Sequence, residues 1–396
     1  MKTKLLLIIG ITTIVTFTVL SAFIITSDKS GSFKILTSKT ISGKVHSVDM
    51  DGYSHIVVGT QNGNHNGSLY YLDDTSNIIW KKDLDKIIGK VDVSRDGQFV
   101  TVASYELTDG AGQAYYDNLI YFFDKSGQML WSYPERQDST NSDTFDYASY
   151  GFDVTEDGNN IIIVFKNKIK LFGNRGNEIW ENIVQGEIRS AKISSKGDII
   201  VVGALPIFDE NDFDWGLNAF TKDGNLLWQK TGTEGQIISG DGIDVSSNGN
   251  YIAIGLASGG DNGTLFVFDK LGSLKWKNDI GSTVLYTYFT EDEKHLIAST
   301  NDGLRFYDMN GNLLWKKDIL FHPSISSEYI VGESPDYASY LLKFFDYDGN
   351  LIATHPLETA VRSIAISDDS KLIVVGTGES EIGPSTLYYF NQVSLG

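Results

Sequence analysis

A repeated unit constrains the fold of this chain more than any other feature of its sequence. The unit is a short apolar strand followed by a turn whose general form is Gly-x-hydrophobic-hydrophobic-Trp. Successive units are 51, 49, 48, 48, 39 and 38 residues apart, and such a period is typical of the four-stranded blades of a β-propeller. A seventh unit has Ala353 at the tryptophan position. We expect the tryptophans to pack between neighbouring blades; they are Trp80, Trp131, Trp180, Trp228, Trp276 and Trp315.

A second signal lies upstream of the strand in each unit. Residues 92–97 read Asp-Val-Ser-Arg-Asp-Gly and residues 153–158 read Asp-Val-Thr-Glu-Asp-Gly, each followed by a run of Val, Ile or Phe. Shorter versions occur at 194–197 and 246–249. These patterns predict hairpins in which glycine supplies a positive φ. Each unit therefore consists of strands a, b, c and d, with tight a–b and c–d turns.

The chain ends predict how the ring closes. Seven complete units end near residue 356, and residues 361–366, 372–375 and 387–390 supply only strands a, b and c of another. Residues 33–39 lie where that unit needs its strand d. We predict an all-β, eight-bladed propeller of four-stranded antiparallel blades, closed by the N-terminal strand. Seven blades is the alternative, because the unit around residues 324–341 is short and irregular.

The first 32 residues form a separate segment. Lys2 and Lys4 precede residues 5–27, a run without charge that is long enough to cross about 30 Å of hydrocarbon as a helix. A cleaved signal peptide is one interpretation. We favour an uncleaved single-pass anchor, because the nearest cleavage candidate, around Ala22, is followed by more apolar residues. The basic N-terminal flank predicts a cell-membrane protein whose propeller, residues 33–396, lies outside the cytoplasm.

Composition excludes several kinds of chemistry. The chain has no cysteine, which rules out disulfides, thiolate zinc sites and cysteine nucleophiles. Its net charge of −19 argues against nucleic acid as a partner. The Asp-x-Asn-Gly-Asn run at 308–312 lacks the further ligands of a calcium loop and is interpreted as a turn. We predict no catalytic residue, no cofactor and no metal site.

The turn of each unit also carries a family resemblance. Residues 124–131 and 269–276 follow the pattern Asp-x-x-Gly-x-x-x-Trp, which resembles the tryptophan-docking repeat of the pyrroloquinoline-quinone-like propellers across residues 33–396. The upstream hairpins are similar to those of WD-repeat propellers. The pyrroloquinoline-quinone-like superfamily includes a non-catalytic assembly scaffold. It also includes quinoprotein dehydrogenases, which use adjacent cysteines and a calcium site. Because the cysteines and a matching calcium motif are missing here, the resemblance implies a non-catalytic member.

The long connections are confined to the b–c and d–a positions, which emerge on one face of a propeller. Three of them, residues 104–117, 133–149 and 205–215, carry −10 of the −21 charges of residues 33–396. They are either solvated loops or an acidic, aromatic-rich surface that binds a protein or glycan at the cell surface. The candidate binding residues are Tyr115, Tyr116, Asp143, Phe145, Asp146, Asp209, Glu210, Asp212, Phe213, Asp214 and Trp215.

These observations favour a membrane-anchored, extracytoplasmic scaffold that binds or assembles other molecules without catalysis. The alternative is a propeller enzyme, either quinone-dependent or carbohydrate-active through acids at the mouth of its funnel. Fold alone does not decide between the two.

Overall fold

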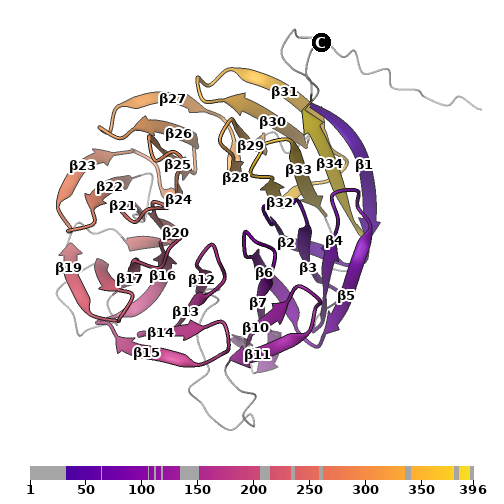
Figure 1. Cartoon of the computed structure of the whole chain (residues 1–396). Coiled ribbons are helices and arrows are strands. Elements are labelled where there is room, and N and C mark those ends of the chain that lie inside the picture. The colour runs from indigo at the N-terminus through magenta and orange to yellow at the C-terminus, as the bar shows by residue number, and fades with distance from the viewer. Residues whose placement is uncertain are drawn as a thin grey trace, which may run out of the picture. The chain divides into compact units, whose positions relative to one another are not determined.

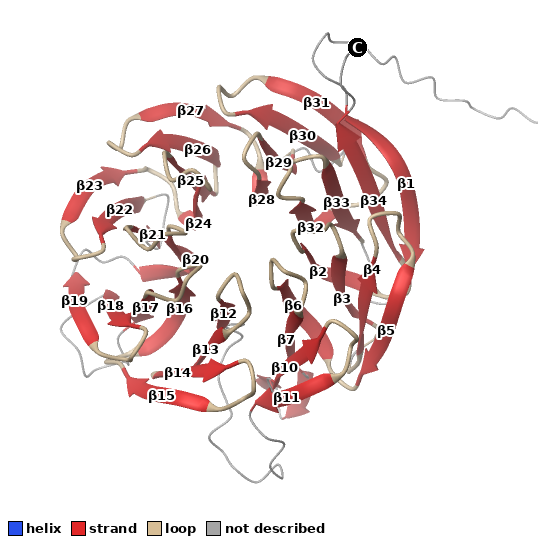
Figure 2. Cartoon of the chain, viewed as in Figure 1, coloured by secondary structure: helices blue, strands red, loops and turns tan. Residues whose placement is uncertain are grey.

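The computed structural model describes residues 33–63, 65–105, 107–110, 113–116, 119–133, 151–205, 215–232, 237–257, 262–334, 340–378 and 383–392. The regular elements in these ranges are all β-strands (Figure 2). None of the described residues forms a helix long and apolar enough to cross a membrane. The apolar run at residues 5–27, predicted to be an anchor, lies outside the described residues and remains a prediction.

The strands form a ring of eight blades of four antiparallel strands each, as predicted (Figure 1). One parallel bridge, from Asp241 to Tyr286, joins blades 5 and 6 into a single sheet. From its inner to its outer strand, blade 1 contains β2 (Lys44–Met50), β3 (Ile56–Gln61), β4 (Gly67–Leu72) and β5 (Ile78–Leu84). In the same order, blade 2 contains β6 (Ile87–Val93), β7 (Phe99–Tyr105), β10 (Leu119–Asp124) and β11 (Met129–Tyr133), and blade 3 contains β12 (Phe152–Val154), β13 (Asn160–Phe165), β14 (Lys168–Gly173) and β15 (Glu178–Ile183). Blade 4 contains β16 (Glu187–Ile193), β17 (Ile199–Leu205), β18 (Trp215–Thr221) and β19 (Leu226–Gly232).

The second half of the ring follows the same order. Blade 5 contains β20 (Ile237–Val245), β21 (Tyr251–Ala257), β22 (Gly263–Asp269) and β23 (Leu274–Asp279). Blade 6 contains β24 (Val284–Phe289), β25 (His295–Thr300), β26 (Gly303–Asp308) and β27 (Leu313–Lys317). Blade 7 contains β28 (Leu320–Ile325), β29 (Tyr329–Glu333), β30 (Leu341–Asp346) and β31 (Leu351–Pro356). Blade 7 is therefore complete, although its sequence is irregular, and the seven-bladed alternative is wrong.

Blade 8 joins the two ends of the chain. It contains β32 (Val361–Ile366), β33 (Leu372–Thr377) and β34 (Ser385–Gln392), and its outer strand is β1 (Phe33–Ile41). β1 pairs antiparallel with β34, from Phe33 opposite Gln392 to Ile41 opposite Ser385. The predicted closure of the ring by the N-terminal strand is confirmed, and the strand extends two residues beyond the predicted end.

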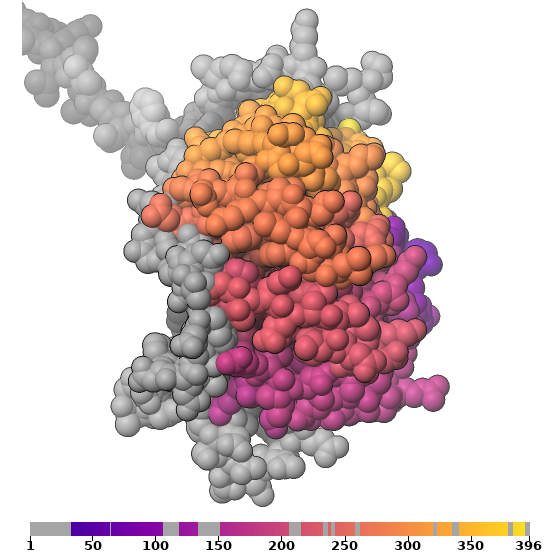
Figure 3. All heavy atoms as spheres, turned by 90° about the vertical axis from the view of Figure 1, so that its left-hand side faces the viewer, coloured from indigo at the N-terminus to yellow at the C-terminus, as the bar shows by residue number. Residues whose placement is uncertain are grey.

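Apolar residues from neighbouring blades form the cores between them. The middle strands are buried on both faces, as in β3 and β4, whereas an outer strand such as β5 alternates between exposed and partly buried positions. One core cluster combines Leu217 of blade 4 with Ile243 and Ile254 of blade 5. Figure 3 shows neighbouring blades stacked against one another in chain order along the rim. Each blade is therefore stabilised chiefly by its neighbours, as in other repeat architectures.

The two faces of the ring differ in their connections. Every a–b and c–d turn contains only three to five residues, and both kinds of turn leave the strands at the same end. The longest connections, 106–118, 134–151 and 206–214, all belong to the b–c or d–a type and therefore leave at the opposite end. The strand bounds thus support the predicted division into a tight-turn face and a long-loop face.

Candidate functional site

Tryptophans of the outer strands join each of the first six blades to the next. The indole nitrogen of Trp180 in β15 donates to the carbonyl oxygen of Lys222 at 2.9 Å, in the c–d turn of blade 4. The ring lies over Gly224 of the same turn, where an added Cβ would be 2.9 Å from two ring atoms. The same indole-to-carbonyl bond is made by Trp80 to Lys125, Trp131 to Asn174, Trp228 to Lys270, Trp276 to Met309 and Trp315 to Tyr347.

The c–d turns are shaped by aspartate and glycine. Asp124 Oδ1 accepts hydrogen bonds from the backbone nitrogens of Ser126 and Gln128, both at 2.9 Å. Gly127 has a φ of +79°, which an L side chain rarely adopts. The turn therefore has the structure that the sequence predicted, and it presents the carbonyl on which the tryptophan docks. Among the described residues, no group of three or more His, Asp or Glu side chains is arranged to hold a metal ion.

The a–b turns of blades 1 to 5 form a hydrogen-bonded collar around the central channel. The backbone nitrogen of Gly52 donates to the carbonyl of Arg95 at 2.8 Å, and that of Arg95 donates to Glu156 at 2.8 Å. Glu156 then donates to Ser195 at 3.0 Å, and Ser195 donates to Ser247 at 3.2 Å. The collar fixes the turns relative to one another and holds their side chains around the channel mouth.

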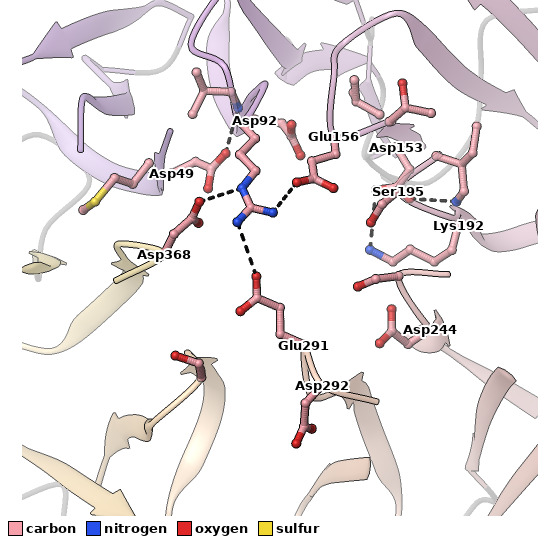
Figure 4. Close-up of a pocket in the computed structure, with 18 of the residues that line it drawn as sticks. Asp49, Asp92, Asp153, Glu156, Lys192, Ser195, Asp244, Glu291, Asp292 and Asp368 are labelled. Atoms are coloured by element: carbon pink, nitrogen blue, oxygen red, sulfur yellow. Dashed lines mark hydrogen bonds and ion pairs between the residues drawn. The ribbon is translucent and has the colours of Figure 1, made fainter. Parts of the chain in front are cut away.

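The Arg95 side chain extends across this mouth. Its guanidinium pairs with Glu156 of blade 3, with Asp368 of blade 8 at 2.7 Å and with Glu291 of blade 6 at 3.8 Å (Figure 4). The hydrogen bond to Glu156 raises the pKa of the Arg95 guanidinium above its ordinary value. One cation from blade 2 therefore links three other blades, including the one directly opposite.

A cavity of about 700 Å³ lies at this end of the channel, and Arg95 is among its lining residues. Four aspartates and one lysine occupy equivalent positions near the ends of five successive inner strands and line it (Figure 4). They are Asp49 in β2, Asp92 in β6, Asp153 in β12, Lys192 in β16 and Asp244 in β20.

Three of these aspartates connect one blade to the next. Asp49 Oδ2 accepts from the backbone nitrogen of Val93 at 2.7 Å, and Asp153 Oδ2 accepts from Ile193 at 2.8 Å. Asp244 Oδ2 accepts from Phe289 at 2.7 Å. Each of these carboxylates thus accepts a hydrogen bond from an inner-strand amide of the next blade, and this gives the three aspartates a structural role.

The surroundings of the cavity change the acidity of these groups. Burial within the ring raises the pKa of Asp244 to about 6. Burial also raises the pKa of Asp92, and the nearby Asp49 carboxylate raises it further. Burial likewise raises the pKa of Asp49. The cavity therefore carries less negative charge near neutral pH than a count of its carboxylates suggests.

The predicted binding residues lie in different places. Trp215 begins β18 and is only 4% exposed, with its ring 5.7 Å from that of Phe266 in blade 5. It is a core residue rather than part of an exposed binding surface, because the strand starts at Trp215 and turns its side chain towards the next blade.

The remaining candidates belong to the long connections. Tyr115 and Tyr116 lie in β9 (Gln113–Tyr116), which pairs with β8 (Leu107–Gly110) to form a hairpin inserted between the second and third strands of blade 2. The other candidates are outside the described residues: Asp143, Phe145, Asp146, Asp209, Glu210, Asp212, Phe213 and Asp214.

Sequence reasoning missed the channel cavity. Its signal was present, because an aspartate stands two residues before Ser or Thr in residues 92–94, 153–155 and 244–246. We interpreted residues 92–94 and 153–155 only as the start of a hairpin, and the pattern at 244–246 only from Ser246 onwards. The spacing does not reveal that Asp153 and Asp244 accept hydrogen bonds from the next blade, since those contacts depend on how the blades pack in the ring.

Comparison with known proteins gives a family. Residues 101–382 match a family model described as a family of unknown function, DUF5711. The chain belongs to this family. No curated protein matches it. The matched range runs from strand β7 of blade 2 to the connection between β33 and β34 in blade 8, so it includes most of the ring.

Solved structures resemble the chain at the level of the fold. The C-terminal WD40 domain of Sif2 is 13% identical with a TM-score of 0.67, and the match covers 92% of this chain and 99% of that one. BamB from Moraxella catarrhalis is 14% identical with a TM-score of 0.59, covering 91% and 100%. The Dos1 propeller is 11% identical with a TM-score of 0.62, covering 91% and 95%. Identities this low show a shared propeller fold and nothing about activity.

Proposed function

We propose that this protein is a membrane-anchored, extracytoplasmic propeller that acts as a non-catalytic binding or assembly scaffold. The observation that carries the proposal is the contrast between the two faces of the ring. The longest connections leave the strands at one end only, while tryptophan contacts join blades 1 to 7 and the collar joins the a–b turns of blades 1 to 5. Loops on a rigid framework are a common arrangement for recognition, because the framework reduces the entropy lost on binding.

The charge of the long connections defines the expected partner. Residues 104–117, 133–149 and 205–215 together carry −10. An acidic surface that also contains tyrosine and phenylalanine suits a basic protein surface or a glycan, through ion pairs, hydrogen bonds and stacking on the aromatic rings. The fold likeness to WD40 and BamB propellers is compatible with this role, and so is the resemblance of the turns to pyrroloquinoline-quinone-like propellers.

The proposed location depends on the N-terminal segment. Residues 5–27 carry no charge, and residues 28–32 form a short polar link to β1. An anchor at this point attaches the propeller to the membrane, with Lys2 and Lys4 on the cytoplasmic side. A partner is then another component of the cell surface.

Charge-neutralising variants on the two faces test the proposed binding role. The long-loop variant combines Asp209→Asn, Asp212→Asn and Asp214→Asn in tagged full-length protein. The control combines Asp74→Asn, Asp223→Asn and Asp348→Asn, three exposed positions in c–d turns. Both variants change the charge by the same amount. We expect cross-linking on intact cells, followed by quantitative mass spectrometry, to show partners lost from the long-loop variant alone. Equal recovery from the wild type and both variants would contradict a role for these loops.

A further inference from the structure

Blade 8 is held differently from the other seven blades. We call the contact between a strand-d tryptophan and the c–d turn of the next blade a tryptophan dock. Such docks occur at six consecutive interfaces, from that between blades 1 and 2 to that between blades 6 and 7. Ala353 takes the tryptophan position in β31, because it lies opposite Phe344 just as Trp315 lies opposite Phe306. No indole from blade 7 therefore reaches blade 8.

The interface between blades 8 and 1 lacks both the tryptophan and the glycine of a dock. Thr37 of β1 lies opposite Tyr389 beside the β-bulge, in the place that Trp80 has opposite Tyr71. In the c–d turn of blade 1, Ser76 has a φ of +71° where the turns of blades 2 to 7 use glycine. Serine is possible at this position because no indole covers its Cβ. The two replacements together show that blade 1 receives no dock from blade 8.

Phe33 takes the place of a dock between blades 7 and 8. Blade 8 has no c–d turn, since its third and fourth strands are opposite ends of the chain. Phe33 is 1% exposed and stacks on Phe344 with centroids 4.3 Å apart. Its ring meets Tyr329 edge-on at 5.1 Å, and its carbonyl oxygen accepts from His355 Nε2 at 2.7 Å. The first residue of β1 therefore fills the slot between these blades.

At the channel mouth, blade 8 lies in the part of the ring that the collar does not include. The backbone bonds between a–b turns run from blade 1 to blade 5, and among the described residues none reaches the turns of blades 6, 7 and 8. The turn of blade 8 is held by side chains instead. Asp368 pairs with Arg95 at 2.7 Å, and Ser370 Oγ lies 3.1 Å from Ser327 Oγ.

We propose that blade 8 is the opening blade of the ring and that β1 is a detachable strap which keeps it closed. Opening separates β1 from β34, withdraws Phe33 from its slot and breaks the Arg95–Asp368 pair. The channel cavity then gains a side entrance that the docked interfaces do not provide. The proposal rests on the ring itself and holds whether or not residues 5–27 span a membrane.

Hydrogen exchange of the full-length protein in detergent tests this directly. Strands β1 and β34 are compared with β19 and β18, the equivalent strands of blade 4, which lies opposite and is docked on both sides. We expect the amides paired between β1 and β34 to exchange at least about tenfold faster, through a local opening. Equal or slower exchange in β1 and β34 would overturn the proposal.

A grafted dock gives a second test. Thr37→Trp together with Ser76→Gly recreates the pair found at the six other interfaces. We expect exchange of β1 and β34 to slow severalfold in the double variant and to change little in Thr37→Trp alone, because the Ser76 Cβ then blocks the ring. Gly224→Ser is the matched control and should speed exchange in blades 3 and 4. Faster or unchanged exchange in a double variant with a native circular dichroism spectrum would contradict the strap. If that variant does not fold, the wild-type comparison decides.

Discussion

The indole nitrogen of Trp180 lies 2.9 Å from the carbonyl oxygen of Lys222, and its ring covers Gly224 in the same turn. This contact explains why the sequence repeats as it does. A tryptophan in one unit requires a glycine in the next unit, because a Cβ at 2.9 Å from the ring atoms cannot be accommodated. The repeat therefore records contacts between blades as well as the structure within each blade.

Gly224→Ala should lower stability by about 2–4 kcal/mol, since it combines an unfavourable positive φ with a steric clash against the indole. Gly281→Ala is the control, because Gly281 has a φ of +66° but no atom near an added Cβ. It should lose only the backbone part, about 1–2 kcal/mol. Urea unfolding measures the free energy of unfolding of both variants. Equal losses of stability would mean that the Trp180 indole does not restrict residue 224.

Trp215→Ala should destabilise the protein by about 3–5 kcal/mol, because a large buried ring leaves a cavity between blades 4 and 5. Trp215→Phe should lose much less, since most of the apolar contact remains. Thermal unfolding checks this without any partner. A Trp215→Ala variant as stable as the wild type would contradict the placement of Trp215 in the core between blades 4 and 5.

Much of the fold could be predicted from the sequence because short-range signals repeat. The Gly-x-hydrophobic-hydrophobic-Trp unit, its period and the upstream hairpin pattern predicted the blades, and the missing strand d predicted the closure by β1. Trp215 could not be placed correctly, because an aromatic residue beside four acids looks like a loop residue until the strand start is known. The cavity required contacts between blades, such as Asp49 to Val93, that no local pattern contains.

Phe33→Ala should lower stability by about 3–5 kcal/mol, because the ring loses its stack on Phe344 and the slot between blades 7 and 8 empties. Removing residues 33–41 should lower the melting temperature far more than Phe33→Ala does, since β34 then loses its partner strand. Lys34→Ala, which changes an exposed neighbour in β1, is the control and should leave the melting temperature almost unchanged. A normal melting transition after the deletion would show that the ring closes without β1.

The Asp244 carboxyl should make stability fall as the pH rises from about 4 to about 6. Its pKa is about 6 in the folded protein and 3.8 when unperturbed, so in this window the folded state holds a proton that the unfolded state has released. Asp244→Asn keeps an oxygen for the Phe289 amide but does not titrate. Urea midpoints at pH 4.5 and 7.0 should therefore differ less in the variant. The same pH dependence in both proteins would contradict the raised pKa.

Arg95→Gln should cost about 1 kcal/mol at low salt, because the exposed half of the side chain limits what its three ion pairs contribute. The loss should shrink in 0.5 M NaCl as the charges are screened. Lys371→Gln removes the single exposed pair with Asp369 and is the control, with a smaller expected effect. A salt-independent loss in Arg95→Gln would point to packing rather than charge.

Labelling on intact cells tests most directly whether the propeller works outside the cytoplasm on an uncleaved anchor. The chain has no cysteine, so Asp223→Cys places one thiol at an exposed c–d turn. We predict that a membrane-impermeant maleimide modifies this thiol on intact cells, on a protein whose mass includes residues 1–32. Modification only after lysis would contradict the proposed location, and a labelled protein that lacks the N-terminal segment would contradict the anchor.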